Sequence, residues 1–351
     1  MKNYKIEELR AIALLMVLCA HFSLTNDIIS FGGGKIFPFY LGADLFFVIS
    51  GYFAGLKIMQ NSFKPFAYCR KRVCKLYPPV CLLILLTGLL ELCCNQLSVI
   101  DPVLYCDMDT YVRESVYTLL GNLKWEYTCY AYGQFWYFRT LLWLYLGSAC
   151  LGWVLSYIKI NRMKILKLIM SLLLSICLIV RVSILCGNSY VGNVMEIILN
   201  YKMDFYFGGI LCATLHEKKR KVNMMYVYLL IPFIIGIYSC GGLWGIYENK
   251  FLTGIIYPIA LLFYMLALLV ARDNGEMRVR AWIEYVASRS YYMYVFNFFA
   301  LVVAWLIIYN ICPDIFYINP IWYGIVQICV GSVVLLFLSE YSFNRFEKRN
   351  F

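Results

Sequence analysis

The chain has 351 residues, of which 62% are hydrophobic and only 15% are charged, and its formal net charge is +11. Because a soluble domain is roughly half apolar and a quarter charged, this composition excludes an ordinary soluble fold and favours a protein embedded in lipid. The basic residues form short tracts between apolar runs, as at 216–221. That pattern is typical of membrane loops, so the positive charge does not indicate nucleic-acid binding.

The apolar runs are long enough to cross a bilayer as helices, for which about 20 residues are needed. They are continuous and lack the alternation of membrane β-strands, so only helices are considered. The sequence therefore predicts an all-α fold, a polytopic bundle of about ten transmembrane helices. In chain order the predicted spans are 7–25, 38–59, 77–98, 134–157, 165–186, 194–215, 224–243, 251–271, 288–310 and 321–342.

The placement of Lys and Arg predicts the orientation of these spans, because cytoplasmic loops carry an excess of both residues. With the N-terminus in the cytoplasm, the outer loops hold only Lys35, Arg113, Lys124 and Lys250. Both termini are then cytoplasmic, and residues 99–133 form an external loop. We expect one transmembrane domain over 1–351, without an appended soluble domain, in the cytoplasmic membrane.

The first predicted span carries two ionisable residues, Arg10 and His21. Eleven residues at 100° each bring both onto one helix face, roughly 16 Å apart along the axis. Ionisable groups inside spans usually face the bundle interior or a wet cavity. The alternative is structural: Arg10 reaches the inner interface, and His21 hydrogen-bonds a neighbouring helix.

The second predicted span opens with Gly42–Phe53, which contains Asp44. Because the first two spans are antiparallel, Asp44 and His21 are expected at similar depth. A carboxylate beside an imidazole fixes the tautomer of the ring. The alternative for Asp44 is a salt bridge to Arg139.

The segment 63–76 precedes the third span and places apolar and basic residues on separate stripes of a helix. This pattern predicts an interfacial amphipathic helix that contacts membrane lipid. Its basic residues attract anionic lipid, and each is worth about 1 kcal/mol near the surface. Elsewhere, Cys106 and Cys129 share the external loop, and the sequence leaves open whether they pair.

Several motifs occur in a fixed order along the chain. Arg10 and His21, then Gly42–Phe53, then Arg70–Pro78 resemble the opening third of the acyltransferase-3 family of membrane O-acyltransferases. The resemblance extends over essentially the whole chain. The later segments that resemble the family are Phe135–Arg139, Phe205–Gly209, Ser290–Asn297 and Phe346–Lys348.

The resemblance implies an enzyme that moves an acyl group, usually acetyl, from cytoplasmic acyl-CoA to a hydroxyl of a glycan or glycolipid. Acyl-CoA is then a co-substrate, with no permanently bound cofactor and no metal. The motif histidine and arginine of the family match His21 and Arg10. Where members often have Arg-x-x-Arg, this chain has Arg72-x-x-Lys75, and many members have His where Asn297 stands.

These matches predict two catalytic residues, His21 as general base and Asp44 as the group that orients it. Arg10, Arg139 and Trp136 are expected to bind substrate. The phosphates of coenzyme A are expected to bind Arg70, Arg72 and Lys75.

Three alternatives stay open at this stage. In the first, a covalent acyl-histidine intermediate forms. In the second, the protein transports or flips lipid-linked sugars, which predicts no thioester turnover. In the third it is a membrane scaffold without catalysis, which predicts tolerance of substitutions at His21 and Asp44.

Overall fold

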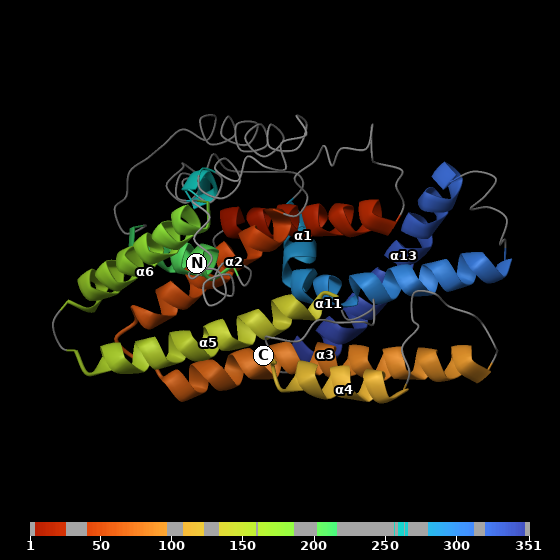
Figure 1. The fold of residues 1–351 in the computed structure, drawn as a ribbon, viewed down its shortest axis with the longest axis horizontal. Helices are drawn as coiled ribbons and strands as arrows, with labels where there is room; N and C mark the ends of the chain where they lie inside the picture. Colours follow the sequence, from red (N-terminus) through yellow and green to blue (C-terminus); the bar gives the residue numbers. More distant parts are fainter. Residues whose placement is uncertain are drawn as a thin grey trace. The chain divides into compact units, whose positions relative to one another are not determined.

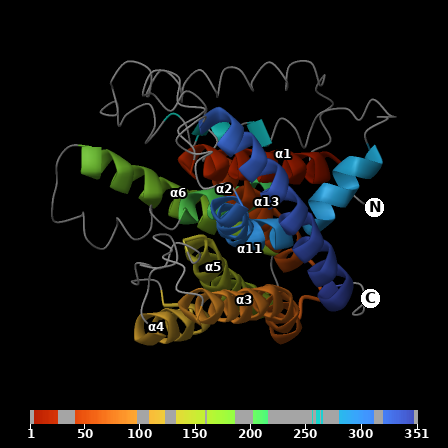
Figure 2. The ribbon, with the colours of Figure 1, turned by 90° about the vertical axis from the view of Figure 1, so that its right-hand side faces the viewer.

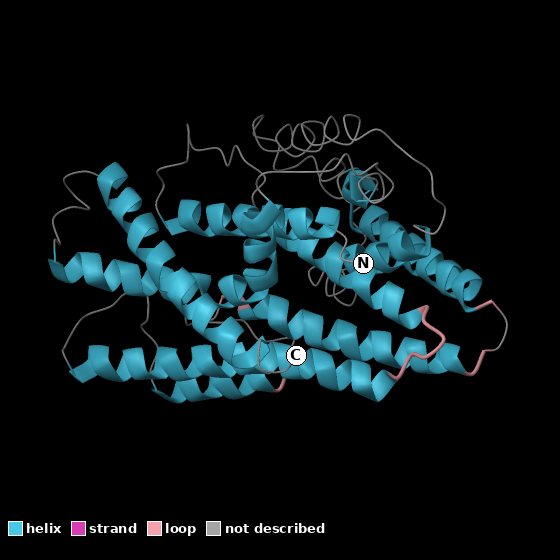
Figure 3. Ribbon diagram, turned by 180° about the vertical axis from the view of Figure 1, so that it is seen from behind, coloured by secondary structure: helices cyan, strands magenta, loops and turns pink. Residues whose placement is uncertain are grey.

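The helical content of the chain follows from its apolar composition, because helices satisfy their own backbone hydrogen bonds in lipid. The computed structural model describes residues 4–25, 41–96, 108–122, 133–158, 161–185, 202–215, 256, 259–262, 264–265, 280–311 and 320–347. Within these ranges every regular element is a helix and none is a strand (Figures 1 and 3). The all-α prediction is confirmed for this part of the chain.

Apart from α4, the long described helices lie at predicted spans in chain order, but α1, α2 and α8 are not among those that are long and apolar enough to cross a membrane. Among the described helices, five are long and apolar enough to cross a membrane, namely α3, α5, α6, α11 and α13. The bounds are α1 Tyr4–Thr25, α2 Leu41–Ile58, α3 Pro65–Gln96, α4 Met108–Leu119, α5 Phe135–Ser156, α6 Arg162–Leu185, α8 Met203–Leu215, α11 Arg280–Ile311 and α13 Pro320–Ser342, followed by the π-helical turn η5 Phe343–Glu347.

Two of the predicted spans are not tested by these helices. The span 224–243 lies outside the described residues, and so does most of 251–271. Cys106 and Cys129 also lie outside them. The count of ten spans and the location of the termini therefore stay predictions.

Helix α3 differs from the prediction of an interfacial helix followed by a separate span. It runs without interruption from Pro65 to Gln96, with Pro78 and Pro79 inside it. Membrane helices tolerate internal proline where neighbouring groups satisfy the freed backbone. Pro78 and Pro79 leave the carbonyls of residues 74 and 75 without their helical donors, and at the adjoining position the Tyr291 hydroxyl donates to the Leu76 carbonyl at 2.8 Å. The basic segment 63–76 is thereby a direct extension of a membrane helix.

Helix α4 lies within the predicted external loop and packs beside α3 (Figures 1 and 2). The Tyr111 hydroxyl donates to the Ile84 carbonyl at 2.5 Å. Gly121 ends α4 with a φ of 69°, and the amides of Gly121 and Asn122 donate to the carbonyls of residues 118 and 117, both at 3.0 Å. These two bonds are the pattern of a Schellman cap, which needs a left-handed residue at the position that Gly121 occupies.

The helices divide between two compact units, each built from distant parts of the sequence. The first unit comprises Met1–Met16, Ser30–Tyr68 and Leu144–Ala287. The second comprises Val17–Ile29, Cys69–Trp143 and Ser288–Phe351. Helix α1 contributes its first part to the first unit and its last part, with His21, to the second.

In the first unit, α2 and α8 pack closely through glycines. A Cβ on Gly51 would collide with the backbone carbonyl of Tyr206, and a Cβ on Gly209 with that of Val48. Small residues allow such close backbone approach between membrane helices. The Tyr206 hydroxyl also hydrogen-bonds the Ser148 hydroxyl of α5 at 2.8 Å. The helix pair therefore holds its side chains in fixed positions.

Candidate functional site

His21 lies in α1 beside the middle of α11, within the second unit. Its ring centroid is 4.3 Å from that of Phe298, with the two planes tilted by 45°. Asn297, which is 2% exposed, lies beside the imidazole, and its Oδ1 accepts no hydrogen bond from the described residues. The histidine that the first motif singled out is thus surrounded by an aromatic ring and a buried amide.

The amide of Asn297 is anchored to its own helix. Its Nδ2 donates to the Tyr294 carbonyl at 2.8 Å. The sequence marked position 297 only as a departure from the family pattern. Its proximity to His21 brings it into the site, although an amide is neither an acid nor a base at ordinary pH.

Gln134, just before α5, is a buried residue that sequence reasoning missed. Its Nε2 donates to the Val295 carbonyl at 2.8 Å, and the Tyr137 and Tyr294 rings have centroids 4.6 Å apart. Among the described residues, none donates a hydrogen bond to Gln134 Oε1. Only its position directly before the Phe135–Arg139 motif could have marked Gln134 as a site residue in the sequence. The start of α5 is therefore fixed to the turn of α11 that reaches His21.

Arg139 and Trp136 both lie on α5 in the second unit. Arg139 is 2% exposed, and its Nη1 donates to the Asn122 carbonyl. Asn122 belongs to the C-terminal cap of α4. In the same cap, the Gly121 carbonyl accepts a hydrogen bond from the Trp143 indole at 2.7 Å. Trp136 is half-buried. The segment that contains α4 thus supplies one of the contacts that fix the buried guanidinium.

Asp44 lies on α2 in the first unit and forms an ion pair with Lys202. The distance from Asp44 Oδ1 to Lys202 Nζ is 3.1 Å, and the side chains are 4% and 34% exposed. Lys202 directly precedes α8 and has a φ of 54°, a strained value for a residue with a side chain. The sequence analysis gave a salt bridge to Arg139 as the alternative role of Asp44. Within the first unit, Asp44 instead forms its ion pair with Lys202.

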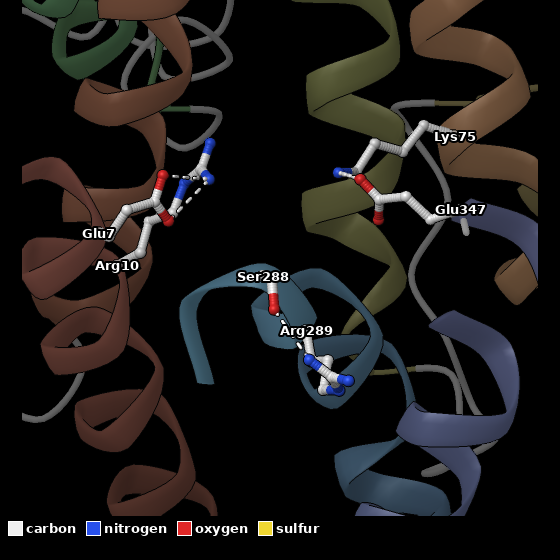
Figure 4. A network of polar contacts seen from close by, with 6 residues as sticks. All are labelled: Glu7, Arg10, Lys75, Ser288, Arg289 and Glu347. Atoms are coloured by element: carbon white, nitrogen blue, oxygen red, sulfur yellow. Dashed lines mark hydrogen bonds and ion pairs between the residues drawn. The ribbon is translucent and has the colours of Figure 1, made fainter. Parts of the chain in front are cut away.

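Arg10 lies in the first unit, one turn after Glu7 on α1. Its Nη1 is 3.4 Å from Glu7 Oε2, and its guanidinium carbon is 4.9 Å from the ring centroid of Phe53. The side chain is 28% exposed. Figure 4 shows the pair of Glu7 and Arg10.

The three basic residues expected to bind coenzyme A lie on the first turns of α3. Arg70 is exposed, whereas Arg72 and Lys75 are partly buried. Lys75 Nζ forms an ion pair with Glu347 Oε1 of η5 at 2.6 Å (Figure 4). This contact joins residues 272 positions apart and had no counterpart in the sequence predictions.

A second ion pair ties α11 to α13. Arg289 Nε and Nη2 lie 2.5 and 3.1 Å from the two carboxylate oxygens of Glu340. The Arg289 guanidinium carbon also lies 4.2 Å from the ring centroid of Phe343 in η5. The end of α13 is thereby held to α11 by one ion pair and to α3 by another.

Comparison with known proteins gives one match. A family model for the acyltransferase-3 domain, described as an acyltransferase domain, matches residues 3–341. No curated protein and no solved structure matches the chain.

Proposed function

The chain belongs to the acyltransferase-3 family, and on that premise we propose that it transfers an acyl group, most simply acetyl, from acyl-CoA to a hydroxyl of a cell-surface glycan or lipid-linked sugar. The family match over residues 3–341 carries this proposal. The half-buried position of His21 beside α11 supports a reaction within the bundle, because ionisable groups inside a membrane usually serve function.

The finer topology is part of the proposal. The protein has about ten transmembrane helices with both termini in the cytoplasm, and the membrane is the cytoplasmic one. The bias of Lys and Arg toward one side supports this orientation. It puts the start of α3 and Glu347 on the cytoplasmic side, where acyl-CoA is found.

The donor binds through its phosphates to the basic start of α3. Arg70 is exposed and Arg72 is partly exposed, so both are accessible to an anion. Guanidinium groups bind phosphate with two parallel hydrogen bonds, and Lys75 adds a point charge. The pantetheine arm then passes Arg10 toward His21, along the helix that carries both residues.

His21 acts as general base. It removes the proton from the acceptor hydroxyl as the hydroxyl oxygen attacks the thioester carbonyl carbon. When the tetrahedral intermediate collapses, the carbon–sulfur bond breaks and the leaving thiolate takes the proton from the imidazolium. Arg139 and Trp136 bind the acceptor, and the accepting oxygen of Gln134 suits a substrate rich in hydroxyl or amide donors. Asp44 stays a proposed member of the site, held by Lys202.

The test measures transfer of label from acetyl-labelled acetyl-CoA to candidate glycan or lipid-linked acceptors in membranes that contain the protein. His21→Gln is expected to lower the rate at least 100-fold, since general-base catalysis contributes about 10²–10⁴-fold. The chain has two histidines, so His216→Gln is the matched control and should retain activity. Equal rates in wild type and His21→Gln would refute the mechanism. No transfer by wild type with any donor would favour a transporter.

A further inference from the structure

The orientation of the Asn297 side chain can be deduced from its anchor. A backbone carbonyl only accepts hydrogen bonds, so the atom 2.8 Å from the Tyr294 carbonyl oxygen is the amide nitrogen. The amide oxygen is then on the other branch of the planar group. The hydrogen-bond network thus supports this assignment of the two atoms.

His21 is the neighbouring residue that can donate a hydrogen bond to this oxygen. Asn297 Oδ1 is buried and accepts no hydrogen bond from the described residues. The Asn297 side chain lies beside the imidazole, and the ring of the next residue, Phe298, has its centroid 4.3 Å from that of the imidazole. An amide oxygen has no proton to give, so the imidazole nitrogen that faces it has to carry the hydrogen. In a neutral imidazole the other nitrogen then holds the lone pair.

We propose that Asn297 is a positioning residue that fixes one neutral tautomer of His21, so that the nitrogen facing away from the amide is the proton acceptor. The reaction that this nitrogen serves rests on the proposed function, whereas the assignment of the tautomer does not. It gives Asn297 the orienting role that the sequence had suggested for Asp44. Orienting a catalytic imidazole by an acceptor on its other nitrogen is established chemistry, and an amide can supply the acceptor.

The surrounding contacts give the amide a fixed position. Gln134 holds the Val295 carbonyl at 2.8 Å, and the Tyr137 ring packs against Tyr294 with centroids 4.6 Å apart. Helix α5 therefore braces the same turn of α11 that carries Asn297. A hydrogen-bond acceptor has to be held in this way to select one tautomer.

The direct test is ¹⁵N NMR of the purified protein labelled with ¹⁵N-histidine, at a pH where the imidazole is neutral. His216→Gln leaves His21 as the only labelled residue, because the chain has two histidines. We expect one tautomer in this background, two tautomers in exchange in Asn297→Leu, and one again in Asn297→Asp, which keeps an accepting oxygen. A mixture in the background, or an unchanged single tautomer in Asn297→Leu, would overturn the proposal.

Gln327→Leu is the matched control. Gln327 is a buried amide, 3% exposed, whose nitrogen donates to another carbonyl of α11, that of Leu301, at 3.5 Å. Its loss removes the same kind of group from the interface of α11 with α13, rather than from that of α11 with the helix that carries His21. The His21 tautomer should not change in this variant, and a change would show that the signal reports general loosening of α11.

Kinetics supply a second readout in the His216→Gln background. Asn297→Leu is expected to lower kcat about 10- to 100-fold, less than complete loss of a general base, with the donor KM changed less than threefold. Asn297→Asp should recover most of the loss. A raised KM with normal kcat would assign Asn297 to substrate binding and overturn the positioning role. If the wild type transfers no acyl group while the NMR result holds, the proposed function fails and the tautomer assignment stands; unchanged transfer in Asn297→Leu would overturn the positioning role.

Discussion

The ion pair between Lys75 and Glu347 lies where the proposed donor site meets the end of α13, so it connects stability with donor binding. Glu347→Gln removes the carboxylate charge and keeps the shape. At the 2.6 Å separation, two unit charges in an effective dielectric of 20 attract by about 6 kcal/mol. Because the side chains are 39% and 20% exposed, solvent screens much of this attraction, and the net contribution to stability is ~1 kcal/mol.

Glu347→Gln is expected to lower stability but to raise the affinity for the acyl donor. In the wild type a phosphate has to compete with the Glu347 carboxylate for the Lys75 ammonium. Removing that competitor makes up to ~1 kcal/mol available to the phosphate, which corresponds to an about fivefold lower KM for acyl-CoA. We expect kcat to stay within twofold, since neither residue contacts the reacting atoms.

The assay measures donor KM in membranes at low and at physiological salt, together with thermal unfolding of the purified protein. Glu340→Gln is the matched control, because it removes the same charge and breaks the ion pair to Arg289, which is outside the proposed donor site. It should lower stability without lowering KM. Lys75→Met should cancel the gain of Glu347→Gln when the two are combined. A higher KM in Glu347→Gln would show that the carboxylate positions Lys75 for the donor, and would refute the competition.

Two further predictions concern the helix pair of the first unit. Gly209→Ala should lower the stability of the protein by about 1–3 kcal/mol, the usual effect of overpacking, because the added Cβ would collide with a backbone carbonyl of α2. Gly147→Ala is the control and should be neutral, because its Cβ would meet nothing within 4 Å. Equal thermal unfolding of the two variants would contradict this packing. Lys202→Met should destabilise the protein by about 1–3 kcal/mol by leaving the buried Asp44 carboxylate without its cation, and Asp44→Asn should recover most of that loss in the double variant. Additive losses in this cycle would show that the ion pair contributes nothing.

The sequence predicted the helices well because the bilayer limits the choice of structure. Long apolar runs become helices wherever they lie in lipid, and α5, α6 and α13 begin within three residues of their predicted starts. The predicted interfacial segment and the third span form one helix, α3, which accommodates Pro78 and Pro79 in its interior. Local sequence patterns therefore predict the presence of a helix better than they predict the residues at which it begins and ends.

The contacts of the site were much less predictable. Helical periodicity places Arg10 and His21 on one face of α1, but hydropathy carries no information on which helix lies opposite. The partner of Lys75 is 272 residues away, and many carboxylates could have filled that role. Position 297 was notable in the sequence only as a missing histidine. The fold gives it significance by bringing it to His21.

The choice of an amide at position 297 has a physical rationale. Burying an ionised carboxylate in the bundle costs several kcal/mol unless a cation accompanies it, as Lys202 accompanies Asp44. A buried amide needs only hydrogen bonds, and Asn297 satisfies its nitrogen within its own helix. Its oxygen accepts no hydrogen bond from the described residues, and in the proposed arrangement the N–H of a neutral imidazole pairs with it without a buried charge. Asn297→Asp should therefore preserve the tautomer of His21 and still lower stability, and a variant as stable as the wild type would contradict this account.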